Sequence, residues 1–184
     1  MEIIKTEIPD VLEIKPKIFG DDRGYFFESF RADAFNEAVG HEVTFVQENQ
    51  SFSQQGVLRG LHLQKGAHAQ GKLVRVITGK VLDVAVDARP NSKTFGQWVS
   101  RVLDAEKFNM LYVPEGFAHG FYTIEDATFH YKCTSFYNKS AESGVRWDDP
   151  TINVNWQTNS QPLVSEKDAV LLSWEELIMD LKGA

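Results

Sequence analysis

The chain has 184 residues, of which 42% are hydrophobic and 12% aromatic, and this length and composition fit one compact domain with a sizeable core. Its formal net charge of -7 and its isoelectric point near 5.2 create a long-range field that repels polyphosphate. We therefore expect no general surface for nucleic acid or for anionic membranes, and any phosphate must be bound by a local cluster of side chains.

The single cysteine, Cys133, excludes an internal disulfide and a cysteine-rich zinc site. A chain with so little cysteine is expected in a reducing compartment. Residues 1 to 20 contain no continuous apolar segment of the kind found in a secretory signal, and no stretch reaches the length of an apolar membrane span. We expect a cytoplasmic protein that forms one domain over residues 1 to 184, with an N-terminal arm and a C-terminal helical segment.

In chain order, the first predicted element is a short helix over residues 32 to 39, ended by Gly40. From residue 43 to about 137, short apolar alternations separated by Gly, Pro, Asn and Asp indicate many short antiparallel strands. Residues 73 to 77 and 81 to 87 predict a hairpin with Gly79 in the turn between them.

Further strands are predicted over residues 96 to 103, 109 to 113 and 120 to 137. The polar, tryptophan-containing segment from 138 to 161 favours an ordered loop with short strands. A last helix begins at Ser173, where Ser-Trp-Glu-Glu forms a capping box. The sequence thus predicts a mostly β fold with a few short peripheral helices, and a double-sheet jelly roll is the form that closes most edges around a ligand-binding mouth.

Two histidines are candidate site residues. His62 lies in the run from Val57 to Gln64, where strict alternation places it on the opposite face from Arg59 unless Gly60 marks a bulge. His119 follows a turn rich in Pro and Gly that delivers it to the start of a strand. A catalytic metal site usually needs three protein ligands, and the natural third position, two residues after His62, is a glutamine, so we expect no metal.

Without a metal, neutral His62 is available as a base near neutral pH. A base that removes a carbon-bound proton needs a group that stabilises the enolate, and Lys72 is the candidate. Epimerisation also needs an acid on the opposite face of the carbon, for which Tyr131 and Tyr137 both qualify. Taken alone, each strand tyrosine is more often a packing residue, and Asp168 is ordinarily a solvated or helix-capping carboxylate.

Several ordered motifs run through nearly the whole chain. They are FGDDRGYFFESF (19 to 30), QENQSFS (47 to 53), VLRGLHLQ (57 to 64), GKLVRVITGKVLDVAVD (71 to 87), VPEGFAHGF (113 to 121), YKCTSFY (131 to 137) and LVSEKD (163 to 168). With these motifs the sequence resembles the dTDP-4-dehydrorhamnose 3,5-epimerase family, metal-free members of the cupin jelly rolls. The resemblance implies a cofactor-free isomerase that inverts C3 and C5 of dTDP-4-dehydro-6-deoxy-D-glucose in dTDP-L-rhamnose biosynthesis, giving dTDP-4-dehydro-L-rhamnose.

The same resemblance implies roles for individual residues. His62 is the proton acceptor, oriented by Asp168, and Tyr131 is the proton donor. Lys72 stabilises the enolate oxygen at C4. The implied substrate-binding residues are Phe19, Arg23, Phe26, Glu28, Gln47, Asn49, Arg59, His119, Tyr137, Glu142 and Lys167. The segment around Arg23 holds the thymidine end in this family and is exchanged across a homodimer, so the resemblance also implies a homodimer.

Three alternatives stay open at this point. Related enzymes with the same histidine and aspartate invert only C3 or only C5, or shift the ketone. The pair of His62 and His119 on a jelly roll is also compatible with a metal-dependent cupin enzyme, although Gln64 counts against it. A non-catalytic sugar-nucleotide-binding protein would use the same pocket without needing the base, the acid and the lysine.

Overall fold

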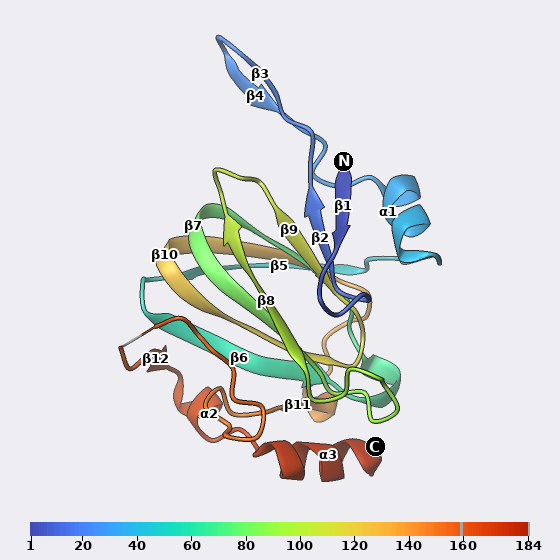
Figure 1. Ribbon diagram of the computed structural model, residues 1–184, viewed down its shortest axis with the longest axis vertical. Helices are drawn as coiled ribbons and strands as arrows, with labels where there is room; N and C mark the ends of the chain where they lie inside the picture. The colour runs from blue at the N-terminus through green and yellow to red at the C-terminus, as the bar shows by residue number, and fades with distance from the viewer. Residues whose placement is uncertain (159, 184) are drawn as a thin grey trace.

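The computed structural model describes residues 1–158 and 160–183, which form two layers of mostly antiparallel strands (Figure 1). Two long strands, β7 (Lys72–Asp87) and β10 (Phe117–Cys133), pair with each other and pass from one layer into the other. The mostly β, double-sheet jelly roll predicted from the sequence is confirmed.

The first layer contains, in order, β1 (Glu2–Lys5), β2 (Leu12–Lys15), β9 (Met110–Val113), the first half of β7, the second half of β10 and β5 (Gln47–Ser53). The second layer contains β8 (Trp98–Asp104), the other halves of β7 and β10, β6 (Val57–Gln64) and β11 (Glu142–Gly144). Strand β12 (Leu163–Val164) pairs in parallel with the start of β6. The strands predicted over residues 96 to 103 and 109 to 113 are therefore present as β8 and β9, whereas the run predicted over 120 to 137 is placed at Phe117–Cys133.

The hairpin predicted around Gly79 is wrong. Residues 72 to 87 form one continuous strand, whose first part pairs with β9 and whose second part pairs with β8. Gly79 has a φ of 73°, and a Cβ atom there would lie 1.9 Å from the carbonyl oxygen of Asp126 on β10. The glycine therefore permits a bend, pressed against β10, where β7 changes layer.

An apolar cluster fills the space between the two layers. Its buried members from the central strands are Val74, Val76, Val81, Ala85, Val99, Leu103, Leu111, Val113, Phe117, Phe121, Ala127 and Phe129. Residues of β7 that alternate with these, such as Leu82 and Val84, belong to a second cluster on the outer face of the second layer. This alternation identifies which strand residues face the interior, where a ligand site can form.

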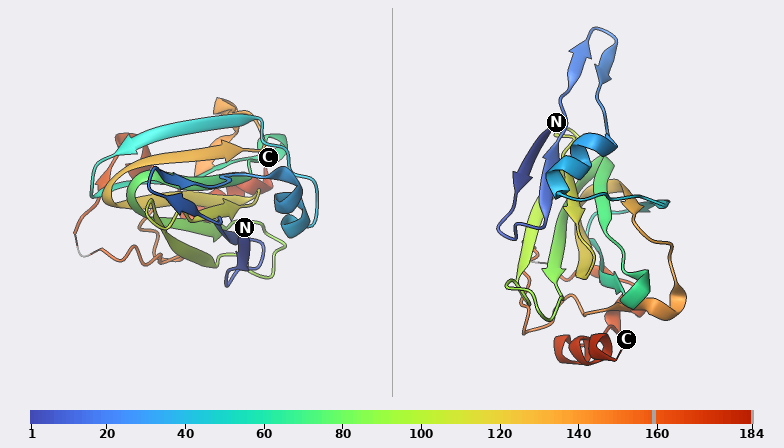
Figure 2. Two further views of the ribbon diagram at one scale, coloured as in Figure 1. Left: turned by 90° about the horizontal axis from the view of Figure 1, so that it is seen from above. Right: turned by 90° about the vertical axis from the view of Figure 1, so that its right-hand side faces the viewer.

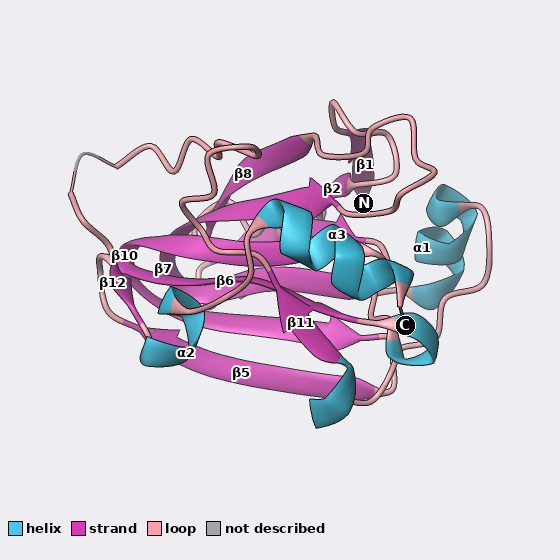
Figure 3. Ribbon diagram, turned by 90° about the horizontal axis from the view of Figure 1, so that it is seen from below, coloured by secondary structure: helices cyan, strands magenta, loops and turns pink. Residues whose placement is uncertain are grey.

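Short helices cover the outer faces of the sandwich. Helix α1 (Ala32–Val39) buries Phe35 against Leu12 and Tyr112 of the first layer. Helix α3 (Trp174–Lys182) buries Trp174 and Leu177 in the cluster outside the second layer. The view from below in Figure 3 shows the helix lying across the outer face of that layer. The predicted bounds of the first helix are confirmed.

The start of α3 follows the predicted capping box. Oγ of Ser173 accepts a hydrogen bond from the backbone N–H of Glu176, and a carboxylate oxygen of Glu176 accepts one from the backbone N–H of Ser173. Before it, α2 (Glu166–Ala169) lies beside β6. Two turns of 3-10 helix occupy Gly66–His68 and Lys139–Ala141, and the second lies in the ordered segment predicted after residue 138, of which residue 159 is outside the described residues.

A hairpin of β3 (Phe19–Asp21) and β4 (Gly24–Phe26) projects from one end of the sandwich, as the side view of Figure 2 makes plain. Within the described residues, no helix combines the length and the apolar character needed to cross a membrane.

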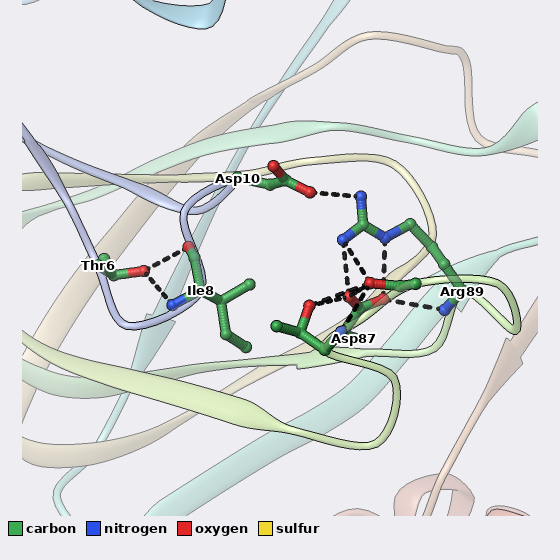
Figure 4. A network of polar contacts seen from close by, with 7 residues as sticks. Thr6, Ile8, Asp10, Asp87 and Arg89 are labelled. Atoms are coloured by element: carbon green, nitrogen blue, oxygen red, sulfur yellow. Dashed lines mark hydrogen bonds and ion pairs between the residues drawn. The ribbon is translucent and has the colours of Figure 1, made fainter.

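A polar network fastens the turn between β1 and β2 to the loop after β7 (Figure 4). The carboxylate of the buried Asp87 accepts a hydrogen bond from Nε of Arg89 at 2.9 Å, and the same guanidinium lies 2.8 Å from Asp10. In the turn, Oγ1 of Thr6 donates to the carbonyl of Ile8 at 2.8 Å. These contacts tie the first strands of the chain to the rest of the sandwich.

Candidate active site

Strand β6 carries a bulge that decides which of its side chains face the interior. Its pairing with β10 sets His62 opposite His119 and Arg59 opposite Phe121, so one residue more is used on β6 than on β10. The bulge considered for Gly60 is thus observed. It places Arg59 and His62 on the same face of the strand.

The glycine at the bulge is required by its surroundings. Gly60 has a φ of 122°, and a Cβ atom there would lie 2.6 Å from the Cα atom of Gly120. The leucines of β6 show the effect of the bulge. Leu58, Leu61 and Leu63 are all buried in the cluster outside the second layer, although Leu58 and Leu61 would lie on opposite faces of a regular strand. The polar residues between them are therefore directed into the sandwich.

His62 is paired with Asp168, which lies 106 residues away in the sequence. Its Nε2 is 2.6 Å from Oδ1 of Asp168, whose Oδ2 accepts a hydrogen bond from the backbone N–H of Gly60 at 3.2 Å. Although burial acts to raise it, hydrogen bonding to His62 and Gly60 leaves the pKa of the Asp168 carboxyl below its ordinary value. A carboxylate accepts the Nε2 proton, so Nδ1 is the ring nitrogen that remains to take a proton.

Local capping fixes the position of Asp168. The residue lies in the first turn of α2, where Oγ of Ser165 accepts a hydrogen bond from the Asp168 backbone N–H at 3.1 Å. A serine at the N-cap commonly supplies an acceptor for one of the backbone N–H groups that have no partner in the first turn of a helix. The pairing of β12 with β6 brings this capped turn to the strand that carries His62.

His119 has a carboxylate partner of its own. It lies directly across from His62 on the neighbouring strand, and its Nε2 is 2.9 and 3.0 Å from the two carboxylate oxygens of Asp83. Both His119 and Asp83 are buried. Burial raises the pKa of Asp83, while the neighbouring His119 and Lys72 act in the opposite direction.

Lys72 places an ammonium in the same space. Its residue is only 9% exposed, and Nζ lies 3.5 Å from the carbonyl oxygen of His62. Burial lowers the pKa of Lys72 from its ordinary value near 10.5, against the opposing influence of Cys133, Asp83 and Glu142. The lysine is therefore held close to the histidine with little access to water.

The structure separates the two candidate tyrosines. Tyr131 lies in the half of β10 that belongs to the first layer, opposite Asn49 of β5, and packs against the inner core. Burial raises its pKa, which keeps the phenol protonated. Tyr137 is instead half exposed, beyond the end of β10. His62 and Tyr131 thus come from opposite layers, which is the arrangement that an inverting acid and base require.

Five predicted substrate-binding residues form a chain of hydrogen bonds. Nε2 of Gln47 donates to Asn49 at 3.0 Å, and Oε1 of Gln47 accepts from the backbone N–H of Tyr137 at 2.9 Å. The hydroxyl of Tyr137 donates to Glu142 at 2.9 Å, and Glu142 also pairs with Nζ of Lys167 at 2.5 Å. The chain connects β5, the segment after β10, β11 and α2.

Arg59 and Gln64 have separate partners. Nε of Arg59 donates to Oγ of Ser53 at 2.9 Å, which joins β6 to β5. Oε1 of the buried Gln64 accepts from the backbone N–H of Asn138 at 2.9 Å. Gln64 therefore holds the segment that follows Tyr137 against β6.

The remaining predicted residues are not brought to this space. Phe19, Arg23 and Phe26 lie in the projecting hairpin, and Glu28 follows it (Figure 1). The guanidinium of Arg23 pairs within the hairpin, with its Nε 3.1 Å from Asp21. In this chain, the hairpin is directed away from the sandwich interior.

In the described part of the chain, residues 1–158 and 160–183, no three histidine, cysteine, aspartate or glutamate side chains are grouped as metal ligands. His62 and His119 each direct Nε2 to a carboxylate, and Gln64 is hydrogen bonded to the backbone.

Residues 5–176 match the family model for dTDP-4-dehydrorhamnose 3,5-epimerase. The epimerase of that name from Salmonella typhimurium is 54% identical over 170 residues, which cover 92% of this chain and 93% of the relative. The chain belongs to the dTDP-4-dehydrorhamnose 3,5-epimerase family. As a member of this family it is an isomerase.

Solved structures of similar proteins agree with that family. The dTDP-6-deoxy-D-glucose-3,5-epimerase from Legionella pneumophila, solved in complex with dTDP-4-keto-L-rhamnose, is 45% identical with a TM-score of 0.94, covering 98% of this chain and 96% of that one. A 3′-monoepimerase from Streptomyces bikiniensis, solved in complex with dTDP-quinovose, is 32% identical with a TM-score of 0.89, covering 96% and 90%. The dTDP-4-dehydrorhamnose 3,5-epimerase fold thus accommodates enzymes named for double and for single inversion.

One residue of this epimerase site was missed by sequence reasoning. Asp83 lies in the apolar run of β7 between Leu82 and Val84, both of which face outward. An acidic residue at the inward position of an otherwise apolar strand is the signal that could have identified it.

Proposed function

We propose that this enzyme inverts C3 and C5 of dTDP-4-dehydro-6-deoxy-D-glucose, producing dTDP-4-dehydro-L-rhamnose. One observation carries the proposal. His62 of the second layer is paired with Asp168, and Tyr131 lies in the first layer, on the other side of the interior. The names of similar proteins from Salmonella typhimurium and Legionella pneumophila support the same substrate class.

His62 acts as the base in each inversion. Because Asp168 accepts the proton on Nε2, neutral His62 presents Nδ1 to the substrate. The C–H bond next to the C4 ketone breaks, its proton passes to Nδ1, and the electron pair moves onto the C4 oxygen as an enolate. The ketone makes this possible because it acidifies the protons at both C3 and C5.

Lys72 and Tyr131 complete the step. The ammonium of Lys72 donates a hydrogen bond to the enolate oxygen, where negative charge develops. Tyr131 then gives its phenolic proton to the same carbon from the opposite face, and a new C–H bond forms with inverted configuration. Each inversion leaves an imidazolium and a phenolate, and proton transfer through solvent restores both groups before the next one.

The nucleotide is held at the rim. Arg59 offers a guanidinium suited to the diphosphate, and the exposed ring of Tyr137 offers a stacking surface for thymine. Glu142 accepts a hydrogen bond from the Tyr137 hydroxyl and pairs with Lys167, and these contacts position the ring.

The projecting hairpin supports a homodimer in which each arm completes the partner's site. Its aromatic side chains are strongly exposed, with Phe19 at 53%, Tyr25 at 63% and Phe26 at 66%. Three exposed aromatic rings beside the guanidinium of Arg23 suit a nucleotide base and a phosphate. Sedimentation of the full chain and of an Arg23→Ala variant, together with their dTDP affinities, tests this arrangement.

Isotope uptake tests the double inversion. The enzyme is incubated with dTDP-4-dehydro-6-deoxy-D-glucose in deuterium oxide, and proton NMR follows C3 and C5. The proposal predicts deuterium at both carbons of the product. Deuterium at C3 alone favours the single inversion for which the Streptomyces bikiniensis relative is named, and no deuterium at either carbon contradicts epimerisation of this substrate.

Two further measurements address the other classes of function. Activity that survives removal of metal by a chelator opposes a metal-dependent cupin enzyme, whereas stoichiometric tight metal supports one. A His62→Asn variant that loses turnover and still binds dTDP separates chemistry from binding. If this variant keeps full turnover, His62 is not the base.

A further inference from the structure

Asp83 is a carboxylate in an apolar environment that the reaction steps above do not use. It is completely buried, and along β7 it alternates with Leu82 and Val84, which face outward. Among the described residues, the hydrogen bonds of its side chain go to His119. A buried carboxylate with so few partners is costly unless positive charge lies close to it.

The geometry toward His119 is defined. Both carboxylate oxygens of Asp83 accept from Nε2 of His119, at 2.9 and 3.0 Å. This contact fixes the plane of the imidazole and leaves Nδ1 as the nitrogen that can contact a ligand. Because His119 is paired across the strands with His62, that nitrogen lies beside the proposed base.

Lys72 places a positive charge near Asp83. Its ammonium is buried, and its hydrogen-bond acceptor, the His62 carbonyl, is distant at 3.5 Å. The titratable groups that surround it are the Asp83 carboxylate, the Cys133 thiol, the Glu142 carboxylate and the His62 imidazole. Glu142 is already paired with Lys167, and the Cys133 thiol is neutral in its ordinary form, so Asp83 is the carboxylate best placed to balance Lys72.

We propose that Asp83 is a positioning residue of this site. It holds His119 through Nε2, so that Nδ1 of the imidazole is left to the substrate as an acceptor, and it balances the buried ammonium of Lys72, which donates to the C4 oxygen of the substrate. The proposal rests on the function proposed above for its choice of substrate atom. Asp83 itself touches neither the sugar nor the nucleotide in this account.

The charge of Asp83 can be separated from its shape. In Asp83→Asn, the amide oxygen still accepts from Nε2 of His119 in nearly the same volume, whereas the negative charge is lost. Lys72 then gives up its proton at a lower pH, because burial disfavours the ammonium and its balancing charge is gone. The matched control is Asp87→Asn, since Asp87 is equally buried on the same strand but pairs with Arg89 at the far end.

The direct measurement is the titration of Lys72 in the full chain, with lysines labelled with carbon-13 at Cε and the Lys72 signal assigned by its loss in Lys72→Arg. We expect the midpoint to fall by about one pH unit or more in Asp83→Asn, which is a tenfold change in proton affinity. The control Asp87→Asn leaves it in place. An unchanged midpoint in Asp83→Asn overturns the proposal.

A reciprocal variant covers the case in which Asp83→Asn does not fold. Lys72→Met replaces the ammonium by an apolar chain of similar length, and the proposal predicts that the Asp83 carboxyl then titrates at higher pH, read from its carbon-13 signal. If the titration midpoint of Asp83 is unchanged in Lys72→Met, the carboxylate and the ammonium do not balance each other's charge. Neither titration needs turnover, so a wild-type enzyme that fails to take up deuterium refutes the proposed function without deciding the role of Asp83.

Discussion

His62 and Asp168 lie 2.6 Å apart, Nε2 to Oδ1, although 106 residues separate them in the sequence. The aspartate is anchored a second time by the backbone N–H of Gly60, the residue that forms the bulge in front of His62. The base and the carboxylate that orients it are therefore fixed by the same irregularity in β6.

Replacing Asp168 by asparagine should lower kcat by about 10²-fold or more, because an amide no longer stabilises the imidazolium that forms when His62 takes a proton. Steady-state kinetics with the 4-keto sugar nucleotide measures this loss, and calorimetry should show dTDP affinity changed little. Asp148→Asn is the matched control, since Asp148 pairs with Arg146 at the surface. A kcat equal to that of the wild type in Asp168→Asn would show that the dyad is not part of the chemistry.

The same carboxylate should contribute to stability in a pH-dependent way. The pKa of Asp168 is lower in the folded chain than its ordinary value, so its contribution is present above the ordinary pKa and is lost as the pH falls through the lowered one. Denaturant unfolding should give Asp168→Asn a deficit of about 1 to 3 kcal/mol at neutral pH that shrinks in acid. If the loss of unfolding free energy in Asp168→Asn does not change with pH, the contribution of Asp168 does not come from its ionised carboxylate.

The alkaline limb of kcat should belong to Lys72. Burial lowers the pKa of Lys72, so this lysine loses its proton at a lower pH than an ordinary lysine does, whereas burial raises the pKa of Tyr131. Activity should fall as the pH rises through the lowered value, and Lys72→Arg should move this limb upward, because a guanidinium stays protonated. A limb that keeps its position in Lys72→Arg would assign it to another group.

The bulge should tolerate no side chain. Gly60→Ala places a Cβ atom 2.6 Å from the Cα atom of Gly120 in a backbone region that glycine favours, and the strain and clash should destabilise the fold by about 3 kcal/mol or more. Gly56→Ala is the control, because Gly56 also has a positive φ of 85° but no atom within 4 Å of its Cβ position. Thermal unfolding of the two variants compares the clash with the strain alone. Equal losses would mean that the close approach to β10 has no energetic role.

Local signals in the sequence predicted local structure well. The helix over residues 32 to 39 and the capping box at Ser173 depend on neighbouring residues, and both are observed. At Gly79 the local signal is not sufficient. A positive φ suits both a turn between two strands and a bend within one strand. Only the pairing of β7 with β8, β9 and β10 distinguishes the two.

The candidate site was predicted less evenly. Motif resemblance supplied His62 and Asp168 as partners, which no local pattern could join over such a distance. Alternation could not choose between Tyr131 and Tyr137, since the choice depends on where β10 ends, at Cys133. The role of Asp83 depends on His119, which lies on another strand, and the run from Val81 to Asp87 by itself predicts only an apolar strand.

The proposed mechanism depends most on His62 and Tyr131 acting on opposite faces of the sugar ring. The most direct measurement compares isotope uptake from deuterium oxide into recovered substrate for His62→Asn and Tyr131→Phe. The control is Tyr112→Phe, since Tyr112 packs against Phe35 of α1 outside the first layer. We predict no uptake with His62→Asn, and uptake with retained configuration with Tyr131→Phe, because the base still removes and returns a proton on its own face. Inverted product from Tyr131→Phe at the rate of the control, or deuterium uptake in His62→Asn, would contradict the assignment.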